Sequence, residues 1–160
     1  MDIKIVLGYD YKDEIRNLFN EYTNMLIEND SKFEYYLKLQ NYEEELNTLD
    51  IKYGLPYGRL FVVLVNNKVT GSIALKKIDN ENCELKRLYV KKEYRGLKLG
   101  TLLTKKLIEE AKSIGYKHIL LDTYPFLTSA INIYRNLGFY DIPIYNNNPI
   151  SEMIYLKLDL

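Results

Sequence analysis

The sequence of 160 residues suits one domain with a substantial hydrophobic core and is short for two, so we expect a single domain over residues 1–160. Its 22 basic and 22 acidic side chains cancel, which leaves no overall field to attract nucleic acid or an anionic membrane, and no apolar run approaches the roughly 20 residues that cross a bilayer. A single cysteine, Cys83, and a single histidine, His118, exclude an internal disulfide framework and a Cys/His metal cluster.

Hydrophobic patterns divide the chain into helices and strands, with no repeat or linker between them. They predict these elements in order: a strand at 3–9, helices at 12–28 and 33–49, strands at 59–65, 69–78 and 83–90, a helix at 99–114, a strand at 117–124, a helix at 127–138, a short strand from 139 and a strand at 151–160. Gly115 and Gly138 fall where the last two helices should end. The order mixes antiparallel hairpins with one βαβ unit, which indicates the α+β class with a mixed sheet.

One short stretch, "YRGLKLGT" (94–101), lies between a predicted strand and a predicted helix. Free N–H groups at a helix N-terminus attract anions, and glycine lets a phosphate approach the backbone closely. Gly96 and Gly100 do not fit the dinucleotide fingerprint, and Thr101 follows Gly100 without the lysine that a P-loop needs. Spacing alone therefore leaves a plain connection and a phosphate cradle as equal alternatives.

Two signatures resemble those of the GNAT superfamily of acetyl-CoA-dependent N-acetyltransferases. The first, Arg/Gln-x-x-Gly-x-Gly/Ala, is matched by Arg95 and Gly100, with Lys98 in place of the middle glycine. The second, Ala-x-x-x-Tyr-x-x-x-Gly-Phe, is matched completely, by Ala130, Tyr134, Gly138 and Phe139. One helix and one strand separate the signatures, as in the family, and the resemblance covers about residues 62–140 well. It implies the GNAT fold, a mostly antiparallel twisted sheet flanked by about four helices.

The resemblance implies that acetyl-CoA binds as the acetyl donor and that no metal is involved. It places the coenzyme A pyrophosphate on the backbone N–H groups of the loop, at Arg95, Gly96, Leu97, Lys98, Leu99, Gly100 and Thr101. It pairs the pantetheine arm with the backbone of the fourth strand, at Leu88, Tyr89 and Val90. Asn132 and Arg135, which flank Tyr134, are further candidates for contacts with the phosphates.

The departure from the signature at Lys98 has a consequence for the backbone. A lysine with positive φ would cost roughly 1 kcal/mol or more, so we expect ordinary dihedral angles at this position. The ammonium group either adds a charge to the phosphates or points into solvent. We favour solvent, because the motif works mainly through its backbone.

The resemblance implies direct attack of a primary amine, on a small molecule or peptide, at the acetyl carbonyl. Such an amine, with a pKa of about 10.4 on a lysine side chain, must first lose a proton. Glu84 is the predicted base, because it lies 11 positions before Arg95, the separation found in the histone-acetylating branch of the family. Strand alternation puts Glu84 on one face with Lys86, Leu88 and Val90. The alternatives are a water as base and a Glu84 that only pairs with a neighbour.

Tyr134 is the predicted acid, because the tyrosine of this signature in the family points its hydroxyl at the thioester sulfur. The alternative is a tyrosine that only packs, which is credible in a chain with 16 tyrosines. The backbone N–H of Val90 is expected to stabilise the oxyanion.

The acceptor amine is not specified by the sequence. Glu43, Glu44 and Glu45 would suit a cationic acceptor, but an acidic run is more often a solvated helix face. The segment "YNNNP" (145–149) either covers the site or forms a plain turn.

The N-terminus lacks the pattern of a secretory signal, so we expect a cytoplasmic protein; a homodimer stays open. The main alternative function is a non-catalytic acyl-CoA sensor of the same fold, and a nucleotide-binding regulatory domain has only the loop in its favour.

Overall fold

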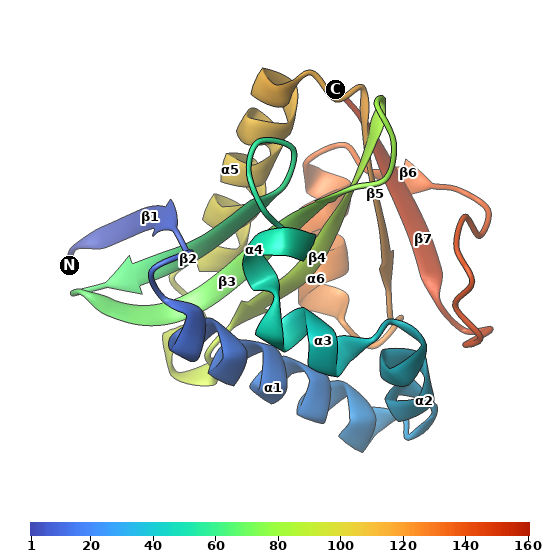
Figure 1. Ribbon diagram of the computed structural model, residues 1–160, viewed down its shortest axis with the longest axis horizontal. Helices are drawn as coiled ribbons and strands as arrows, with labels where there is room; N and C mark the ends of the chain where they lie inside the picture. The colour runs from blue at the N-terminus through green and yellow to red at the C-terminus, as the bar shows by residue number, and fades with distance from the viewer.

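The computed structural model describes all 160 residues, which form one seven-stranded sheet with helices on both faces (Figure 1). The strands are β1 (Ile3–Leu7), β2 (Arg59–Val65), β3 (Lys68–Lys77), β4 (Asn82–Val90), β5 (His118–Thr123), β6 (Tyr140–Asp141) and β7 (Ile154–Asp159). The helices are α1 (Lys12–Asn29), α2 (Lys32–Leu39), α3 (Tyr42–Asn47), α4 (Leu49–Lys52), α5 (Leu99–Ile114) and α6 (Thr128–Asn136), with a short 3₁₀ turn at Lys92–Tyr94. The strand order across the sheet is β1-β2-β3-β4-β5-β7-β6.

All neighbouring strands are antiparallel except β4 and β5. Helix α5 makes the crossover between these two parallel strands, which confirms the predicted βαβ unit and the α+β class. The two strands pair only where residues 82–84 meet residues 118–120. Beyond this point the sheet forks, so the C-terminal half of β4 has no strand partner on its β5 side.

Apolar side chains fill the space on both faces of the sheet. On one face, α5 and α6 cover a cluster of 18 buried residues that includes Leu103 and Leu121. On the other face, α1 to α4 cover a cluster of 16 that includes Phe19 and Tyr53. Successive residues of β2 belong in turn to one cluster and to the other, so this strand is buried on both faces. That explains why its sequence, "RLFVVLV", is a continuous apolar run after its first residue.

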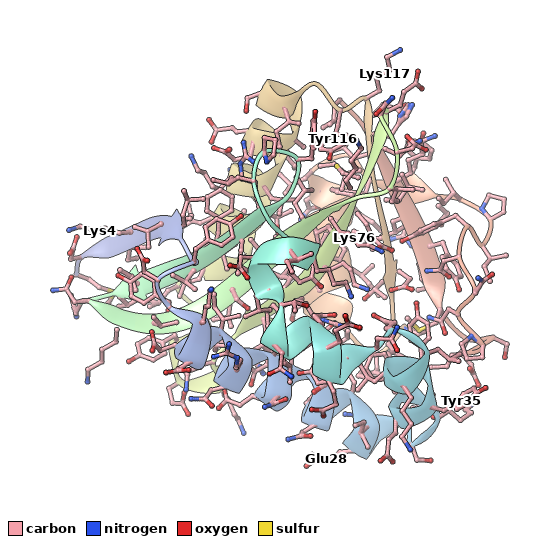
Figure 2. The ribbon with its side chains drawn as sticks, viewed as in Figure 1. Lys4, Glu28, Tyr35, Lys76, Tyr116 and Lys117 are labelled. Carbon is pink, nitrogen blue, oxygen red and sulfur yellow. The ribbon has the colours of Figure 1, made fainter.

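Charged side chains lie mainly on the outside of this layered structure (Figure 2). Lys4, Glu28 and Lys117 are exposed at three separate places on the surface. The longest helix, α1, has 18 residues, and none of the helices has the length and apolar character needed to span a membrane.

The predicted helix at 33–49 is in fact three short helices, α2, α3 and α4, so the fold has six helices rather than about four. Asn41 adopts the left-handed conformation, with φ 55°, between α2 and α3. Thr48, with φ −134°, separates α3 from α4. Both residues occupy non-helical backbone conformations that the apolar spacing does not reveal. The other predicted bounds differ by a few residues at their ends; the last strand begins at Ile154 rather than at 151.

Strand β4 contains a bulge against β3. Ser72 lies opposite Tyr89 and Ala74 lies opposite Lys86, so two residues of β4 face one residue of β3. Arg87, one of these two residues, has a left-handed conformation with φ 60°. An extra residue of this kind reverses the alternation of side chains along the strand.

The bulge makes one sequence prediction wrong, because Glu84 does not share a face with Leu88 and Val90. Leu88 and Val90 pack against the cluster beneath α5. Lys86, which lies two residues after Glu84 and before the bulge, instead hydrogen-bonds Gln40 at the end of α2. The carboxylate of Glu84 therefore lies on the α2 side of the sheet, and the side chains of Leu88 and Val90, beyond the bulge, have the opposite orientation.

Candidate active site

A cleft of about 500 Å³ lies where β4 and β5 separate. Its walls come from β4, the loop before α5, the end of β5, and helices α1, α2, α5 and α6. The first residues of α5 and of α6 both line it, including Gly100, Thr101, Thr128 and Ser129. Because helix N-termini carry positive partial charge, this geometry suits a ligand with an anionic part.

The loop between β4 and α5 offers six consecutive free N–H groups. The backbone N–H groups from Gly96 to Thr101 donate no hydrogen bond within the chain, and Leu102 is the first to donate, to the carbonyl of Lys98 at 3.2 Å. Gly96 has φ 98°, and a Cβ there would meet nothing within 4 Å, so open space lies beside the loop. Free donors beside open space form a cradle for phosphate oxygens.

The prediction of ordinary dihedral angles at Lys98 is wrong. Lys98 has φ 59° and ψ 29°, in the left-handed region, and it caps the N-terminus of α5. A non-glycine residue in this conformation costs about 1–2 kcal/mol, which explains why the signature carries glycine at this place. The strained residue lines the cleft, and its side chain is exposed.

Most of the residues predicted to bind coenzyme A line the cleft: Leu88, Tyr89, Val90, Arg95, Gly96, Lys98, Leu99, Gly100 and Thr101. Leu97 packs instead against the core beneath α5. Asn132 is exposed on α6 and is not part of the cleft wall. Arg135 pairs with Asp141 at 3.0 Å. The side chains of these last three residues therefore lie away from the cleft.

Arg95 folds back over the end of β4. Its backbone N–H donates to the carbonyl of Lys92 at 3.3 Å, so it does not belong to the free donors that the sequence predicted to start at this residue. Its Nε donates to the carbonyl of Val90 at 3.2 Å, and its guanidinium lies 5.7 Å from the centre of the Tyr89 ring. Arg95 thus ties the loop to the strand, and the free N–H groups of the loop begin at Gly96.

Tyr134 presents a free hydroxyl to the cleft. Its side chain lines the cleft although the residue is only 4% exposed, and its ring packs 5.5 Å from that of Phe139. Burial raises the pKa of the Tyr134 phenol, and Tyr22 and Asp122 nearby add to the rise; no hydrogen bond within the chain contributes. The hydroxyl therefore keeps its proton at neutral pH and is available as a donor.

Glu84 lies beside the cleft and not on its wall. The residue is 8% exposed, and its Oε2 accepts a hydrogen bond from the hydroxyl of Tyr145. Burial and then the Glu84 carboxylate raise the pKa of the Tyr145 phenol, so this proton stays in the hydrogen bond. Neither residue is part of the cleft wall. The predicted base is thus already engaged with another side chain.

Asp122, at the end of β5, is the one acidic side chain on the cleft wall. Its Oδ2 accepts hydrogen bonds from the Tyr36 hydroxyl at 3.2 Å and from the amides of Asn146 and Asn148 at 2.8 and 3.2 Å. Its Oδ1 has no donor within the chain. Three donors fix the carboxylate in place, and its second oxygen remains available to a ligand.

Sequence reasoning missed Asp122, although a signal was present. It is a lone acidic residue in the otherwise apolar strand "HILLDT". The segment "YNNNP" contributes no residue to the cleft wall, but it packs behind two acidic side chains. Tyr145 contacts Glu84, and Asn146 and Asn148 both donate to Asp122.

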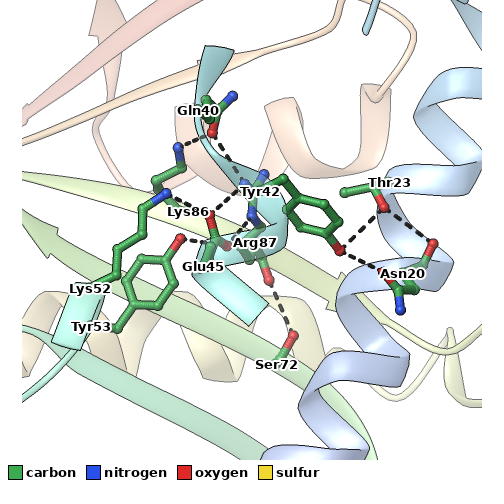
Figure 3. Close-up of polar contacts among 10 residues, drawn as sticks. All are labelled: Asn20, Thr23, Gln40, Tyr42, Glu45, Lys52, Tyr53, Ser72, Lys86 and Arg87. Atoms are coloured by element: carbon green, nitrogen blue, oxygen red, sulfur yellow. Dashed lines mark hydrogen bonds and ion pairs between the residues drawn. The ribbon is translucent and has the colours of Figure 1, made fainter. Parts of the chain in front are cut away.

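A buried ion pair anchors the bulge of β4 to α3 (Figure 3). Glu45, 2% exposed, accepts hydrogen bonds from Arg87 at 2.9 and 3.0 Å, and also from Lys52 and Tyr53. Burial alone raises the pKa of the Glu45 carboxyl, but Arg87 and Lys52 outweigh it and hold the pKa well below its usual range. The sequence predicted that the acidic run Glu43, Glu44 and Glu45 forms a solvated helix face. Glu43 and Glu44 are exposed, but Glu45 is buried, which the sequence did not indicate.

Lys86 is a second cation at the bulge. Its Nζ donates to Oε1 of Gln40 at 2.7 Å, and Arg87 donates to the same oxygen at 3.1 Å (Figure 3). Of the two cations, only Arg87 has a carboxylate partner. Burial, with Arg87 second, lowers the pKa of the Lys86 ammonium to about 8. Gln40, Lys86 and Arg87 all line the cleft.

A forked sheet, a loop of free N–H groups and a tyrosine hydroxyl on one cleft are the features of a protein whose site suits a ligand with an anionic part. The chain matches the model of the GNAT acetyltransferase family over residues 13–139. It is similar to an uncharacterized N-acetyltransferase of Schizosaccharomyces pombe, at 35% identity over 92% of this chain and 88% of that protein. The chain therefore belongs to the GNAT family and is an N-acetyltransferase.

Solved structures show the same fold. A GNAT-family acetyltransferase from Staphylococcus aureus superposes with a TM-score of 0.76 at 26% identity, over 99% of both chains. A GNAT-family acetyltransferase from Elizabethkingia anophelis, solved with acetyl-CoA bound, has a TM-score of 0.58 at 28% identity, over 70% of this chain and 82% of that chain. The predicted GNAT fold is therefore confirmed.

Proposed function

We propose that the protein transfers the acetyl group of acetyl-CoA to the primary amine of a small molecule or peptide by direct nucleophilic attack. The observation that carries this proposal is one cleft with six free N–H groups in its loop and a free Tyr134 hydroxyl on its wall. The E. anophelis relative binds acetyl-CoA, and the donors of this chain fit the pyrophosphate of the same molecule.

The chain's own residues suit each part of acetyl-CoA. The N–H groups from Gly96 to Thr101 bind the pyrophosphate, with the positive end of α5 behind them. The edge of β4 at Leu88, Tyr89 and Val90 has no strand partner on the β5 side and offers backbone groups to the amides of the pantetheine arm. Acetyl-CoA enters as a substrate and leaves as coenzyme A.

The transfer needs two bond changes. The amine nitrogen forms a bond to the acetyl carbon, and the carbonyl electron pair moves onto oxygen, where the N–H of Val90 stabilises the negative charge. Collapse of this intermediate breaks the carbon–sulfur bond, and the sulfur leaves with the electron pair and takes a proton from Tyr134. The nitrogen gives up its remaining extra proton as the amide forms, and a proton from solvent restores the Tyr134 phenol. A phenol with a raised pKa protonates a thiolate of pKa about 8.5 only when it is well placed, so position is what Tyr134 contributes.

The amine proton has two routes out of the cleft. One leads to Glu84 by way of water, since neither Glu84 nor its hydrogen-bond partner Tyr145 is on the cleft wall. The other leads to a water held by Asp122, the acidic side chain that is on the wall. We keep both routes in the proposal, because each agrees with the hydrogen bonds of the site.

Calorimetry and a thiol-release assay test the proposal together. We expect binding of acetyl-CoA, and release of free coenzyme A with some members of a panel of amines, amino acids, peptides and aminoglycosides. Asn132→Ala, outside the cleft, is a control that should leave the Kd of acetyl-CoA unchanged. Binding without release for every acceptor would favour the acyl-CoA sensor. Binding of ATP or NAD, with none of coenzyme A, would refute both functions.

A further inference from the structure

At the end of the cleft near α2, one cation and one carboxylate oxygen have no charged partner within the chain. Lys86 donates only to the neutral amide of Gln40, and it forms no ion pair. Asp122 has three donors on Oδ2 and none on Oδ1. Glu84 of β4 lies opposite Leu120 of β5, and Lys86 and Asp122 are each two residues further along these parallel strands, so both groups lie at the start of the fork, before the strand end that leads into the phosphate loop. In a partly buried site, each unmade charge-assisted hydrogen bond is a loss that a ligand can recover.

Helix α2 fixes the separation of these two groups. Tyr36 hydrogen-bonds Asp122 on β5, and Gln40 hydrogen-bonds Lys86 on β4. Tyr36 and Gln40 are four residues apart, and the N–H of Gln40 donates to the carbonyl of Tyr36 at 3.1 Å, so they lie one above the other on a helical face. The two charged groups are therefore held on either side of the fork by residues one helical turn apart, and they form no ion pair with each other.

We propose that the acceptor is an amino acid, whose amine meets Asp122 and whose carboxylate meets Lys86. The inference rests on the proposed acetyl transfer and adds the class of acceptor. An amino acid gives both groups a partner at once. An amine without an anionic group would leave Lys86 unpaired and would bring a second positive charge beside it.

The remaining wall near α2 indicates the kind of side chain. Met25, Leu26, Phe33 and Met153 line this part of the cleft, together with Tyr124, whose ring lies 5.7 Å from that of Phe33. A polar side chain would lose its hydration there without finding partners. An apolar or aromatic amino acid therefore fits better than a charged one.

The test compares amino acids with their amides as acceptors. Thiol release is measured with phenylalanine, leucine and methionine, and with the three corresponding amino acid amides. The proteins are the wild type, Lys86→Gln, Lys86→Arg, Asp122→Asn and, as a control at the exposed first residue of β3, Lys68→Gln. The quantity of interest is the ratio of kcat/KM for acid over amide. Comparing this ratio between variants cancels the different basicities of the two amines and any general loss of activity.

We expect the ratio to fall roughly 10- to 100-fold in Lys86→Gln, the loss of one hydrogen bond to a charged group. Lys86→Arg should retain the preference, and Lys68→Gln should not alter it. Asp122→Asn should lower kcat/KM for acid and amide alike, because the Asp122 carboxylate binds the amine group that both acceptors carry. A ratio that is the same in the wild type and in Lys86→Gln would overturn the inference, while turnover of any amine would leave the proposed function standing.

A second measurement tests the inference without turnover. Calorimetry in the presence of coenzyme A compares the binding of N-acetylphenylalanine with that of its amide. We expect tighter binding of the acid, and loss of the difference in Lys86→Gln. Equal affinities of the wild type for the two compounds would overturn the inference. Absence of thiol release with every acceptor would refute the proposed function, and this binding experiment would still decide on the amino acid site.

Discussion

Replacing Glu45 by glutamine is expected to lower the free energy of unfolding by about 3–5 kcal/mol. Each carboxylate oxygen accepts two hydrogen bonds, Oε1 from Lys52 and Arg87 and Oε2 from Tyr53 and Arg87. Glutamine has the same shape, but its amide nitrogen cannot accept. Whichever position that nitrogen takes, two donors lose their acceptor. The side chains of Glu45 and Arg87 are 0% and 3% exposed, so water cannot replace the missing acceptor. The positive charge of Arg87 is then buried without a compensating carboxylate.

Urea unfolding followed by circular dichroism measures this loss, which corresponds to a fall in Tm of roughly 6–20 °C for a domain of this size. Glu44→Gln, at the exposed neighbouring position on α3, is the matched control and should change stability by no more than about 0.5 kcal/mol. A Glu45→Gln protein as stable as Glu44→Gln at neutral pH would refute the reasoning.

The same comparison has a defined pH dependence. The folded-state pKa of Glu45 lies below its usual value, so its stabilisation is present above the unfolded value of about 4.3 and is lost as the pH falls through the folded-state pKa. The stability difference between wild type and Glu45→Gln should therefore shrink as the pH falls below about 4. A difference that stays constant down to acid pH would contradict the assigned ion pair.

Three further variants separate roles within the site. Tyr134→Phe keeps the ring and removes the free hydroxyl, so kcat should fall about 100-fold or more while the Kd of acetyl-CoA stays constant; an unchanged kcat would reduce Tyr134 to a packing residue. Lys98→Gly relieves the left-handed strain and removes an exposed charge. It should raise the free energy of unfolding by about 1 kcal/mol at most and weaken acetyl-CoA binding less than about fivefold, and a larger loss would mean that the ammonium contacts the phosphates. Glu84→Gln should flatten the rise of kcat/KM with pH if the proton leaves to Glu84, whereas an unaltered profile, together with a flattened one in Asp122→Asn, would assign the route to Asp122.

Elements that depend on local patterns were predictable from the sequence. The helix expected at 99–114 is the observed α5 (Leu99–Ile114), because apolar spacing defines its buried face and Gly115, with φ 108°, ends it. The division of residues 33–49 into short helices was not predictable, because the apolar pattern runs on through Asn41, whose left-handed conformation ends α2. The loop signature was also readable, and its last glycine has a packing reason. A Cβ on Gly100 would lie 3.0 Å from Ile133, so glycine lets α6 approach α5.

The polar part of the site was not predictable in the same way. Glu84 was assigned to the wrong face, because a single bulge residue, Arg87, reverses the alternation of β4. Asp122 and Lys86 acquire their significance from Tyr36 and Gln40, which are 86 and 46 positions away in the sequence. No spacing rule connects residues so far apart, and only the fold brings them together.

The two ends of the cleft therefore differ in how they are built, and Glu45→Gln should affect them differently. The phosphate cradle is formed by consecutive residues, 96–101, whose backbone N–H groups make no hydrogen bond to α3. The acceptor end depends on α2, which leads through Asn41 into α3, and α3 is held to β4 by the Glu45–Arg87 pair. Loss of this pair releases the element that fixes Gln40 against Lys86. The KM for the acceptor should then rise while the Kd of acetyl-CoA changes little. If the KM of the acceptor and the Kd of acetyl-CoA rise by the same factor, the bulge itself, rather than α2, positions the site.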